Sequence, residues 1–262
     1  MKANNPYRHY MSLFAIFAIA CSSLGTGSGG GGLNLNGDSF VQVKVSADPN
    51  STTVGNALVS NDVTFTEARV VIRDIEFRPS SNCSGSGEFI YEGPYVVNLL
   101  NQKATPSLDE VKLAKGKYCK FEFKLDKLQD NELPAGISSS DEIIDQSVLI
   151  KGTDNTSSTS FVVTLDQNQT YELDSEENGG FELTPNASNT LFLVFNLSKL
   201  FDTIDLSTLD VSSGTIYIDK DNNQDAFDIV KDNLEKFSSL QQDANDNESL
   251  DANDDVIASS PN

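Results

Sequence analysis

Short β-forming segments alternate with turn clusters from Ser39 to Asp219, and this pattern constrains the fold more than any other feature of the chain. The segments are rich in Val, Ile, Phe and Tyr, and some, such as "FVQVKV" at 40–45, alternate apolar with polar residues. Closely spaced strands of this kind are typical of β-sandwiches, and no regular succession of helices separates them. We therefore expect a mainly β fold, a Greek-key-type β-sandwich over residues 38–218. The expected strands cover residues 40–45, 63–77, 88–93, 95–100, 117–125, 147–152, 160–165, 170–174, 179–184, 190–201 and 214–219.

The longest of these segments, residues 63–77, changes the face on which its apolar side chains fall. The change occurs around residues 66–69. A single extra residue in a strand produces such a change, so the sequence predicts a β-bulge or bend there.

Beyond residue 218 the apolar spacing changes to that of a helix, and we expect a C-terminal amphipathic helix over residues 219–242. The last segment, residues 243–262, is polar and acidic, and we expect a disordered tail. The apolar stripe of the expected helix comprises Phe227, Val230, Leu234, Phe237 and Leu240.

Four segments together resemble a known family. They are "VTFTEARVVIRDIEF", "YVVNLL", "LAKGKYCKFEFKL" and "TLFLVFNLSKLF". The pattern is similar to that of bacterial lipoproteins with an uncharacterised prealbumin-like β-sandwich domain of unknown function. The resemblance covers residues 38–218, implies a sandwich in the cell envelope, and brings no catalytic residue with it.

The first twenty residues have the three parts of a secretory signal peptide. Lys2 and Arg8 precede the apolar run "LFAIFAIA", which is too short to span a bilayer. The following "AIAC" resembles the lipobox of bacterial lipoproteins. This resemblance implies that the signal peptide is cleaved before Cys21, which becomes the first residue and is lipidated. Ordinary secretion after Ala20 and an uncleaved anchor are the alternatives. Residues 21–37 then form a Gly/Ser-rich tether.

In bacterial lipoproteins, the residue after the lipidated cysteine helps to decide which membrane the protein is sent to. Ser22 occupies the position where an aspartate favours inner-membrane retention in enteric bacteria. This resemblance implies a cell-envelope protein anchored in the outer membrane, on its periplasmic or its exposed face.

Two cysteines remain for the domain if Cys21 carries lipid. They are Cys83 and Cys119, an even pair in an oxidising compartment. The sequence predicts a disulfide between them. Two separate thiols are the alternative.

Composition excludes several classes of function. The chain carries a net charge of −21, so its surface is unsuited to nucleic acid. Its one histidine, His9, lies in the signal segment, and it has no tryptophan. The domain therefore has no histidine for a catalytic triad or a zinc site.

The segment "DANDNESLDAND" at 243–254 has oxygen-bearing side chains at the spacing of a twelve-residue calcium loop. Glu248 replaces the usual central glycine, and position 12 is aspartate rather than glutamate. The alternatives are a weak calcium site and a solvated acidic tail. The loop "DKDNNQD" at 219–225 shows similar spacing, but a helix cap accounts for it. The candidate ligands in the first loop are Asp243, Asn245, Asn247, Ser249, Asp251 and Asp254.

We therefore expect a non-catalytic binding or structural module, tethered to the membrane by its lipid, whose partner is an envelope protein, an extracellular protein or a ligand. Calcium is the one cofactor that the sequence suggests. A surface adhesin or fimbria-like assembly subunit is the first alternative, and an unpaired strand edge would favour it. A carboxylate-dependent hydrolase is the second, and it would require convergent carboxylates with a shifted pKa.

Overall fold

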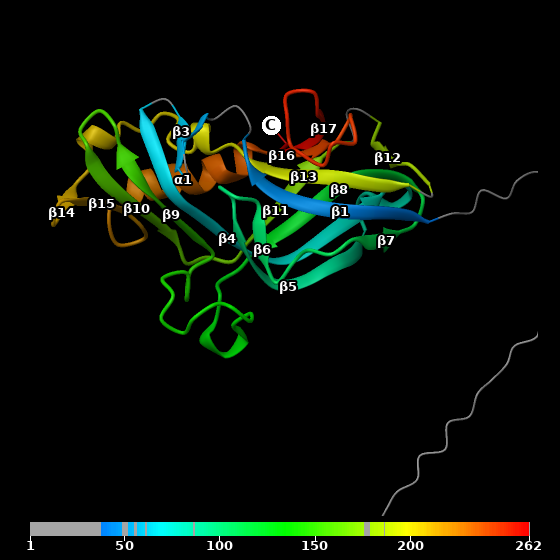
Figure 1. The fold of residues 1–262 in the computed structure, drawn as a ribbon, viewed down its shortest axis with the longest axis horizontal. Coiled ribbons are helices and arrows are strands. Elements are labelled where there is room, and N and C mark those ends of the chain that lie inside the picture. The colour runs from blue at the N-terminus through cyan, green and yellow to red at the C-terminus, as the bar shows by residue number, and fades with distance from the viewer. Residues whose placement is uncertain are drawn as a thin grey trace, which may run out of the picture. The chain divides into compact units, whose positions relative to one another are not determined.

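The structure is a computed structural model, and it describes residues 38–48, 52–54, 57–60, 62–85, 87–175, 179–185 and 187–261. The expected signal peptide, Cys21 and the tether lie outside the described residues. Within the described part the protein is mainly β, as predicted, and its strands join into one mixed sheet that curls on itself (Figure 1). In that part, no helix has the length and apolar character needed to cross a membrane.

The elements are named here in chain order. The strands are β1 (Ser39–Ala47), β2 (Thr52–Val54), β3 (Ala57–Ser60), β4 (Val63–Pro79), β5 (Glu88–Asn98), β6 (Lys103–Thr105), β7 (Val111–Leu113), β8 (Gly116–Leu125), β9 (Val148–Asp154), β10 (Thr159–Leu165), β11 (Gln169–Asp174), β12 (Phe181–Leu183), β13 (Ser188–Phe195), β14 (Val211–Ser212), β15 (Thr215–Ile218), β16 (Ser238–Gln242) and β17 (Asp255–Ser259). The helix is α1 (Gln224–Lys236), and the 3₁₀ turns are η1 (Ser80–Asn82), η2 (Asp130–Glu132), η4 (Leu197–Lys199) and η5 (Leu206–Thr208).

Strand β4 is the central strand of one half of the sheet. Along one edge it pairs first with β9 and then with β8, and along the other edge it pairs with β3 and β5, all antiparallel. Its register against β9 shifts between Phe65 and Glu67. This irregularity confirms the predicted bulge. It allows β4 to pair with both β9 and β8, whose directions diverge along this edge.

The other half of the sheet is built around β13. This strand is parallel to β1 and antiparallel to β16, which forms a hairpin with β17. A single pair, Asp174 with Ser259, joins β17 to β11 and so links the two halves. The sheet therefore curls, and its inner face encloses the core.

Aromatic and branched side chains from both halves fill the main core. Its largest fully buried members include Phe77, Phe121, Phe123, Tyr171 and Phe195. A second, smaller core lies on the opposite face of β4, where residues 126–147 cover Val71 and Leu149 with Leu128 and Ile143. The long loop is thus packed against the sheet by apolar contacts.

Helix α1 buries Phe227, Val230 and Leu234 against the main core. It ends at Lys236, where a helix up to residue 242 was expected, and the chain then enters β16. Leu240 satisfies the helical spacing in the sequence, but in the structure it is a buried strand residue opposite Leu193. The expected helix boundary is therefore wrong, because pairing with β13 outweighs the local helical pattern.

The expected disordered tail also needs correction. Residues 255–259 form β17, and Ala258 is buried. The segment before it is the loop that connects β16 to β17. Low local hydrophobicity suggested disorder, but the hairpin is held by β13 and by the buried Leu240 and Ala258.

Candidate functional site

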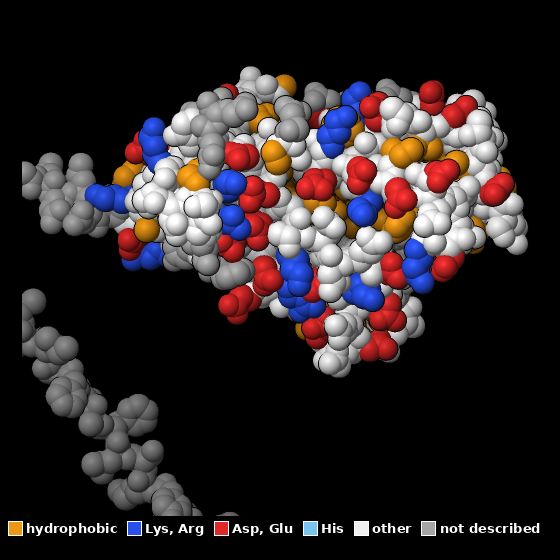
Figure 2. Space-filling view, turned by 180° about the vertical axis from the view of Figure 1, so that it is seen from behind, with side chains coloured by type: hydrophobic (Ala, Val, Ile, Leu, Met, Phe, Trp, Pro, Cys, Tyr) orange, Lys and Arg blue, Asp and Glu red, His pale blue; other side chains and the backbone are white. Residues whose placement is uncertain are grey.

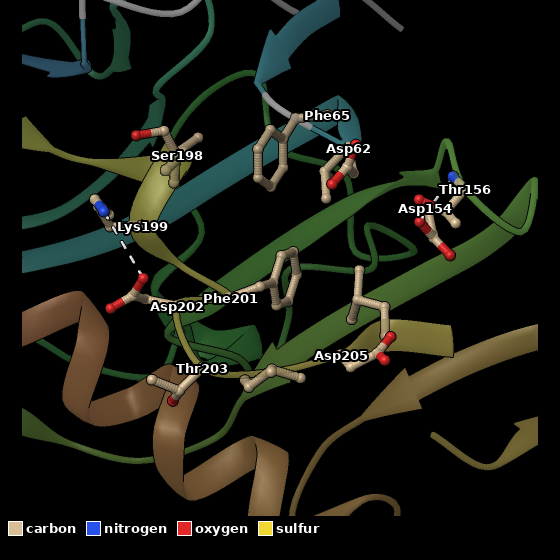
Figure 3. A pocket seen from close by; sticks show the side chains of 14 residues that line it. Asp62, Phe65, Asp154, Thr156, Ser198, Lys199, Phe201, Asp202, Thr203 and Asp205 are labelled. Atoms are coloured by element: carbon tan, nitrogen blue, oxygen red, sulfur yellow. Dashed lines mark hydrogen bonds and ion pairs between the residues drawn. The ribbon is translucent and has the colours of Figure 1, made fainter. Parts of the chain in front are cut away.

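A pocket of about 460 Å³ lies where three distant segments meet (Figure 3). They are the start of β4, the β9–β10 hairpin and residues 197–206. We call it the aspartate-rimmed pocket. Its described lining comprises Asp62, Val63, Phe65, Asp154, Thr156, Leu197, Ser198, Lys199, Phe201, Asp202, Thr203, Ile204, Asp205 and Leu206.

Aromatic rings form the apolar wall of this pocket. The rings of Phe65 and Phe201 are stacked, with centroids 6.2 Å apart and an interplanar angle of 7°. Phe161, outside the lining, meets both rings edge to face, at 6.0 Å and 5.1 Å. Phe65 and Phe161 are buried, whereas Phe201 is half-buried. Phe201 therefore offers a ring surface to a ligand, and the two buried rings support it.

The segment that carries Phe201 is fixed by buried anchors on both sides. Leu197, Leu200 and Leu206 are buried in the main core. From α1, the buried Asn233 donates its amide hydrogens to the carbonyls of Leu200 (3.1 Å) and Asp202 (3.2 Å). These contacts satisfy backbone groups that have no strand partner, and they hold Phe201 over Phe65.

Four aspartates surround the pocket, and they differ in their partners. The carboxylate of Asp154 accepts the backbone N–H groups of Thr156 (3.0 Å) and Ser157 (3.1 Å). Asp202 lies 3.7 Å from the ammonium of Lys199, as the dashed line in Figure 3 marks. Asp154 and Asp202 are therefore engaged within the protein.

The two other carboxylates are more available. Asp205 uses Oδ1 to accept the backbone N–H (3.0 Å) and hydroxyl (2.6 Å) of Ser207. Asp205 thereby caps η5. The Asp62 side chain is exposed and has no hydrogen-bond or ion-pair partner in the described part of the chain. Asp62 and the second oxygen of Asp205 therefore remain free to receive a positively charged group.

Asp154 is the most buried of the four carboxyl groups, and its pKa decides whether that group is charged. Burial alone would raise the pKa of Asp154, but the hydrogen bonds from Ser157 and Thr156 outweigh it and hold that pKa below its usual value. Asp154 is thus ionised at neutral pH. The pocket combines an aromatic wall with fixed negative charge, which suits an organic cation with an apolar part.

A second charged region, on the sheet, is satisfied internally. The guanidinium of Arg78 contacts Glu76 (3.2 Å), Glu122 and Glu172 (3.3 Å). The ammonium of Lys120 lies 2.7 Å from the same Glu172. Figure 2 shows acidic and basic side chains next to one another across one face of the molecule. Because these charges pair across neighbouring strands, they stabilise the sheet and leave little free charge for a ligand.

The predicted disulfide is present. Cys83, just after η1, bonds to the buried Cys119 of β8, with an S–S distance of 2.09 Å. Ser80–Asn82 therefore remains next to β8 although no strand pairs with it. The third cysteine, Cys21, lies outside the described residues.

The predicted calcium loop connects β16 to β17. Asp243 is buried, and its oxygens accept the backbone N–H groups of Asn245 (3.2 Å), Asn247 (3.3 Å) and Glu248 (2.7 Å). The half-buried Asp251 accepts from the amides of Asn245 (3.1 Å) and Asn247 (2.8 Å).

The other predicted ligands belong to the same network. Asp254 accepts the backbone N–H of Asp251 (2.8 Å), while Ser249 donates its own N–H to Asn247 (2.7 Å). Among the described residues, no group of three or more acidic, histidine or cysteine side chains could hold a metal ion. In this arrangement the carboxylates serve as hydrogen-bond acceptors for the loop itself.

Sequence reasoning missed the aspartate-rimmed pocket. Residues 190–201 were expected to form one strand, but β13 ends at Phe195 and the chain turns at Asn196 into η4. The polar run of Asn196, Ser198 and Lys199 is the signal that interrupts the alternation. The approach of this segment to β4 and the β9–β10 hairpin depends on tertiary structure alone.

Comparisons with known proteins do not assign this chain to a family. No protein-family model and no curated protein matches it. Among solved structures it is similar to MbnP from Methylosinus trichosporium, with 11% sequence identity and a TM-score of 0.45, over 79% of this chain and 99% of that one.

Proposed function

We propose that the chain is a lipid-anchored envelope protein whose β domain is a non-catalytic binding module for a small organic cation with an apolar part. The aspartate-rimmed pocket is the observation that carries this proposal. A ring stacked on Phe201 would contact apolar surface, while a cationic group would reach Asp62 or Asp205. The face of an aromatic ring and a carboxylate both attract a positively charged group, so the two features act together.

The state of Asp154 favours binding over hydrolysis in the aspartate-rimmed pocket. A hydrolase that uses two carboxyl groups requires one of them to be protonated near neutral pH, through a raised pKa. The pKa of Asp154 is instead lowered. Its charge is therefore suited to electrostatic attraction of a ligand, and we place the hydrolase alternative behind the binding module.

The location and the finer fold are part of the proposal. The signal segment and "AIAC" support lipidation of Cys21 and an outer-membrane address. The curled sheet, with α1 against the core, supports a Greek-key-type β-sandwich of the prealbumin-like lipoprotein kind. Cys21→Ala tests the anchor: we expect the protein to leave the membrane fraction, and unchanged membrane partition would contradict lipidation.

Three small molecules of matched shape test the ligand class. Phenethylammonium, 2-phenylethanol and phenylacetate share one ring and differ in charge, and their binding is measured by ¹H–¹⁵N NMR titration. We expect phenethylammonium to bind about fivefold more tightly than the alcohol, since each exposed carboxylate contributes up to about 1 kcal/mol. Phenylacetate should bind most weakly.

Variants then locate the site. Asp62→Asn and Asp205→Asn should each weaken phenethylammonium and leave 2-phenylethanol nearly unchanged. The control is Asp228→Asn, an exposed aspartate of α1 outside the pocket. Equal binding of the three molecules, or equal effects of all three variants, would overturn the proposal.

A further inference from the structure

The aspartate-rimmed pocket carries more negative charge than one cationic group can neutralise. Its described lining contains four aspartates, Asp62, Asp154, Asp202 and Asp205, and one basic residue, Lys199. The ammonium of Lys199 lies 3.7 Å from the carboxylate of Asp202, so these two charges offset each other. No ion pair of the described residues involves Asp62, Asp154 or Asp205. Three negative charges therefore remain around one cavity, and a ligand with a single positive charge leaves two of them unmatched.

Separate parts of the chain carry these three charges. Asp62 precedes β4, Asp154 ends β9, and Asp205 precedes η5. Figure 3 shows the side chains of Asp62 and Asp205 clearly apart from one another, with Asp154 to their right. The pair of Lys199 and Asp202 lies on the other side of the stacked rings in this view. The three unpaired carboxylates therefore border the pocket at separate points, away from the lysine of its described lining.

Two of the three carboxylates can receive a charged group from a ligand. Asp154 is buried and uses both oxygens to accept backbone N–H groups, so it contributes attraction at a distance. Asp62 and Asp205 are exposed, and each has at least one carboxylate oxygen without a hydrogen bond in the described part of the chain. Because these two side chains lie apart, one ammonium group contacts only one of them. A second positive group is needed to contact the other.

The remaining charges also select against a zwitterion. An amino acid would bring its own carboxylate into a pocket bordered by three others, and Lys199 is engaged with Asp202. A molecule with two positive charges instead matches two carboxylates and adds no negative one. A cleft lined by charge of one sign focuses its field, so the second positive charge is attracted as well as the first. The volume of about 460 Å³ lies in the range of small-molecule pockets and admits a ring with two short arms.

We infer that the ligand of this pocket is an organic dication, with an apolar core such as an aromatic ring and an ammonium or guanidinium group at each end. The core lies on the ring of Phe201, and the two charges contact Asp62 and Asp205. Asp154 adds attraction to both charges. This inference rests on the proposed function and narrows it from an organic cation to one with two separated charges. It can fail while the pocket still binds single cations.

Three probes of matched size separate the number of charges from their spacing. The first, 4-methylphenethylammonium, carries one charge. The second, 4-(ammoniomethyl)phenethylammonium, carries two charges at opposite ends of the ring, and the third is its 2-substituted isomer, in which the two charges are close together. Binding to the full chain is measured by ¹H–¹⁵N NMR titration. We expect the 4-substituted dication to bind about fivefold more tightly than the single cation, since one added exposed ion pair has at most about this effect. The 2-substituted isomer should bind about as weakly as the single cation.

Variants then test whether the two carboxylates act together. The double variant Asp62→Asn/Asp205→Asn should weaken the 4-substituted dication about 25-fold, because two independent losses of about fivefold multiply. It should weaken the single cation only about fivefold, because that ligand contacts one carboxylate at a time. Asp228→Asn, at an exposed position of α1 outside the pocket, should change neither. The ¹H–¹⁵N spectrum of each variant shows whether the fold is retained. If the double variant does not fold, the two isomers still test the spacing on the parent protein.

The outcomes separate this inference from the proposed function. Equal binding of the 4-substituted dication and the single cation would overturn the inference and leave the proposed function intact. Equal binding of the two isomers would also overturn it, because attraction to the acidic protein as a whole does not depend on the spacing of the charges. If none of the three cations binds, both the inference and the proposed function are wrong.

Discussion

The ring of Phe201 lies parallel to the ring of Phe65, with 6.2 Å between the centroids. Phe65 belongs to β4, and Phe201 follows η4, which is more than a hundred residues later in the chain. The stacked pair thus fixes the segment 197–206 against the sheet. It also forms the apolar wall of the aspartate-rimmed pocket.

Replacing Phe201 should affect both stability and binding. Phe201→Ala removes a half-buried ring, and we expect the free energy of unfolding to fall by about 2 kcal/mol, below the loss for a fully buried ring. Phenethylammonium binding should disappear. Urea denaturation and NMR titration measure the two effects. Phe40→Ala, at a ring that is 39% exposed and outside the pocket, is the control. A Phe201→Ala protein that binds phenethylammonium normally would show that the ring is not the ligand surface.

The long loop 126–147 should respond to acid through Glu132. Its hydrogen bonds with Arg73 hold the pKa of Glu132 below its usual value. A carboxyl group with a lowered pKa stabilises the fold above its unfolded pKa and loses that contribution as the pH falls through the folded pKa. Glu132→Gln should therefore lower the free energy of unfolding at pH 7 by about 1 kcal/mol or less, since the pair is partly exposed.

The same variant should match the parent protein at low pH. Once the pH has fallen below the folded pKa of Glu132, both proteins have a neutral side chain at position 132, so the difference should vanish. Urea denaturation at several pH values checks this. Asp130→Asn, at the exposed neighbour in η2, is the control variant. A Glu132→Gln effect of the same size at both ends of the pH range would contradict the ion-pair explanation.

The disulfide should make a large contribution to stability. Cys83 and Cys119 are 36 residues apart, and closing a loop of that length stabilises the folded state by about 4 kcal/mol in the chain-entropy model. The double variant Cys83→Ser/Cys119→Ser should therefore unfold at a clearly lower urea concentration. Non-reducing peptide mapping of the parent protein should recover the two cysteines in one linked fragment, and two free thiols would refute the bond.

The calcium hypothesis predicts a higher melting temperature in calcium chloride than in a chelator. Asp251→Asn is the suitable variant, because Asp251 is only half-buried, whereas the buried Asp243 holds the loop together. This variant should abolish the calcium effect. Its own melting temperature in chelator is the reference, since Asp251 also accepts hydrogen bonds within the loop. Identical melting curves with and without calcium would identify the loop as a hydrogen-bonded hairpin connection without a metal.

Local patterns predicted most strands because their side chains alternate between core and solvent. The segment 117–125 became β8 (Gly116–Leu125), with Phe121, Phe123 and Leu125 buried on one face. Residues 88–93 and 95–100 were expected to form two strands separated at Gly93-Pro94, but residues 88–98 form one strand, β5. The two residues lie opposite the irregularity between Ile72 and Asp74, so pairing of β5 with β4 resumes beyond them.

The functional regions were less accessible to sequence reasoning because distant segments build them. Nothing near Phe201 in the sequence indicates that it will lie on Phe65. Strand β16, "SSLQQ", has one apolar residue, Leu240, and only its place beside β13 makes it a strand. These features follow from tertiary packing, which overrides local propensity.

The parallel pairing of β1 with β13 has a kinetic consequence. The amide of Asn189 donates to the carbonyl of Phe40 (3.1 Å) across 149 positions of sequence. At synthesis rates of about 5–20 residues per second, β1 must wait roughly ten seconds or more for its partner, and contacts of such long range also form slowly. β1 is thus made early but gains this neighbour late, after local hairpins such as β4–β5 and β9–β10 have been synthesised in full.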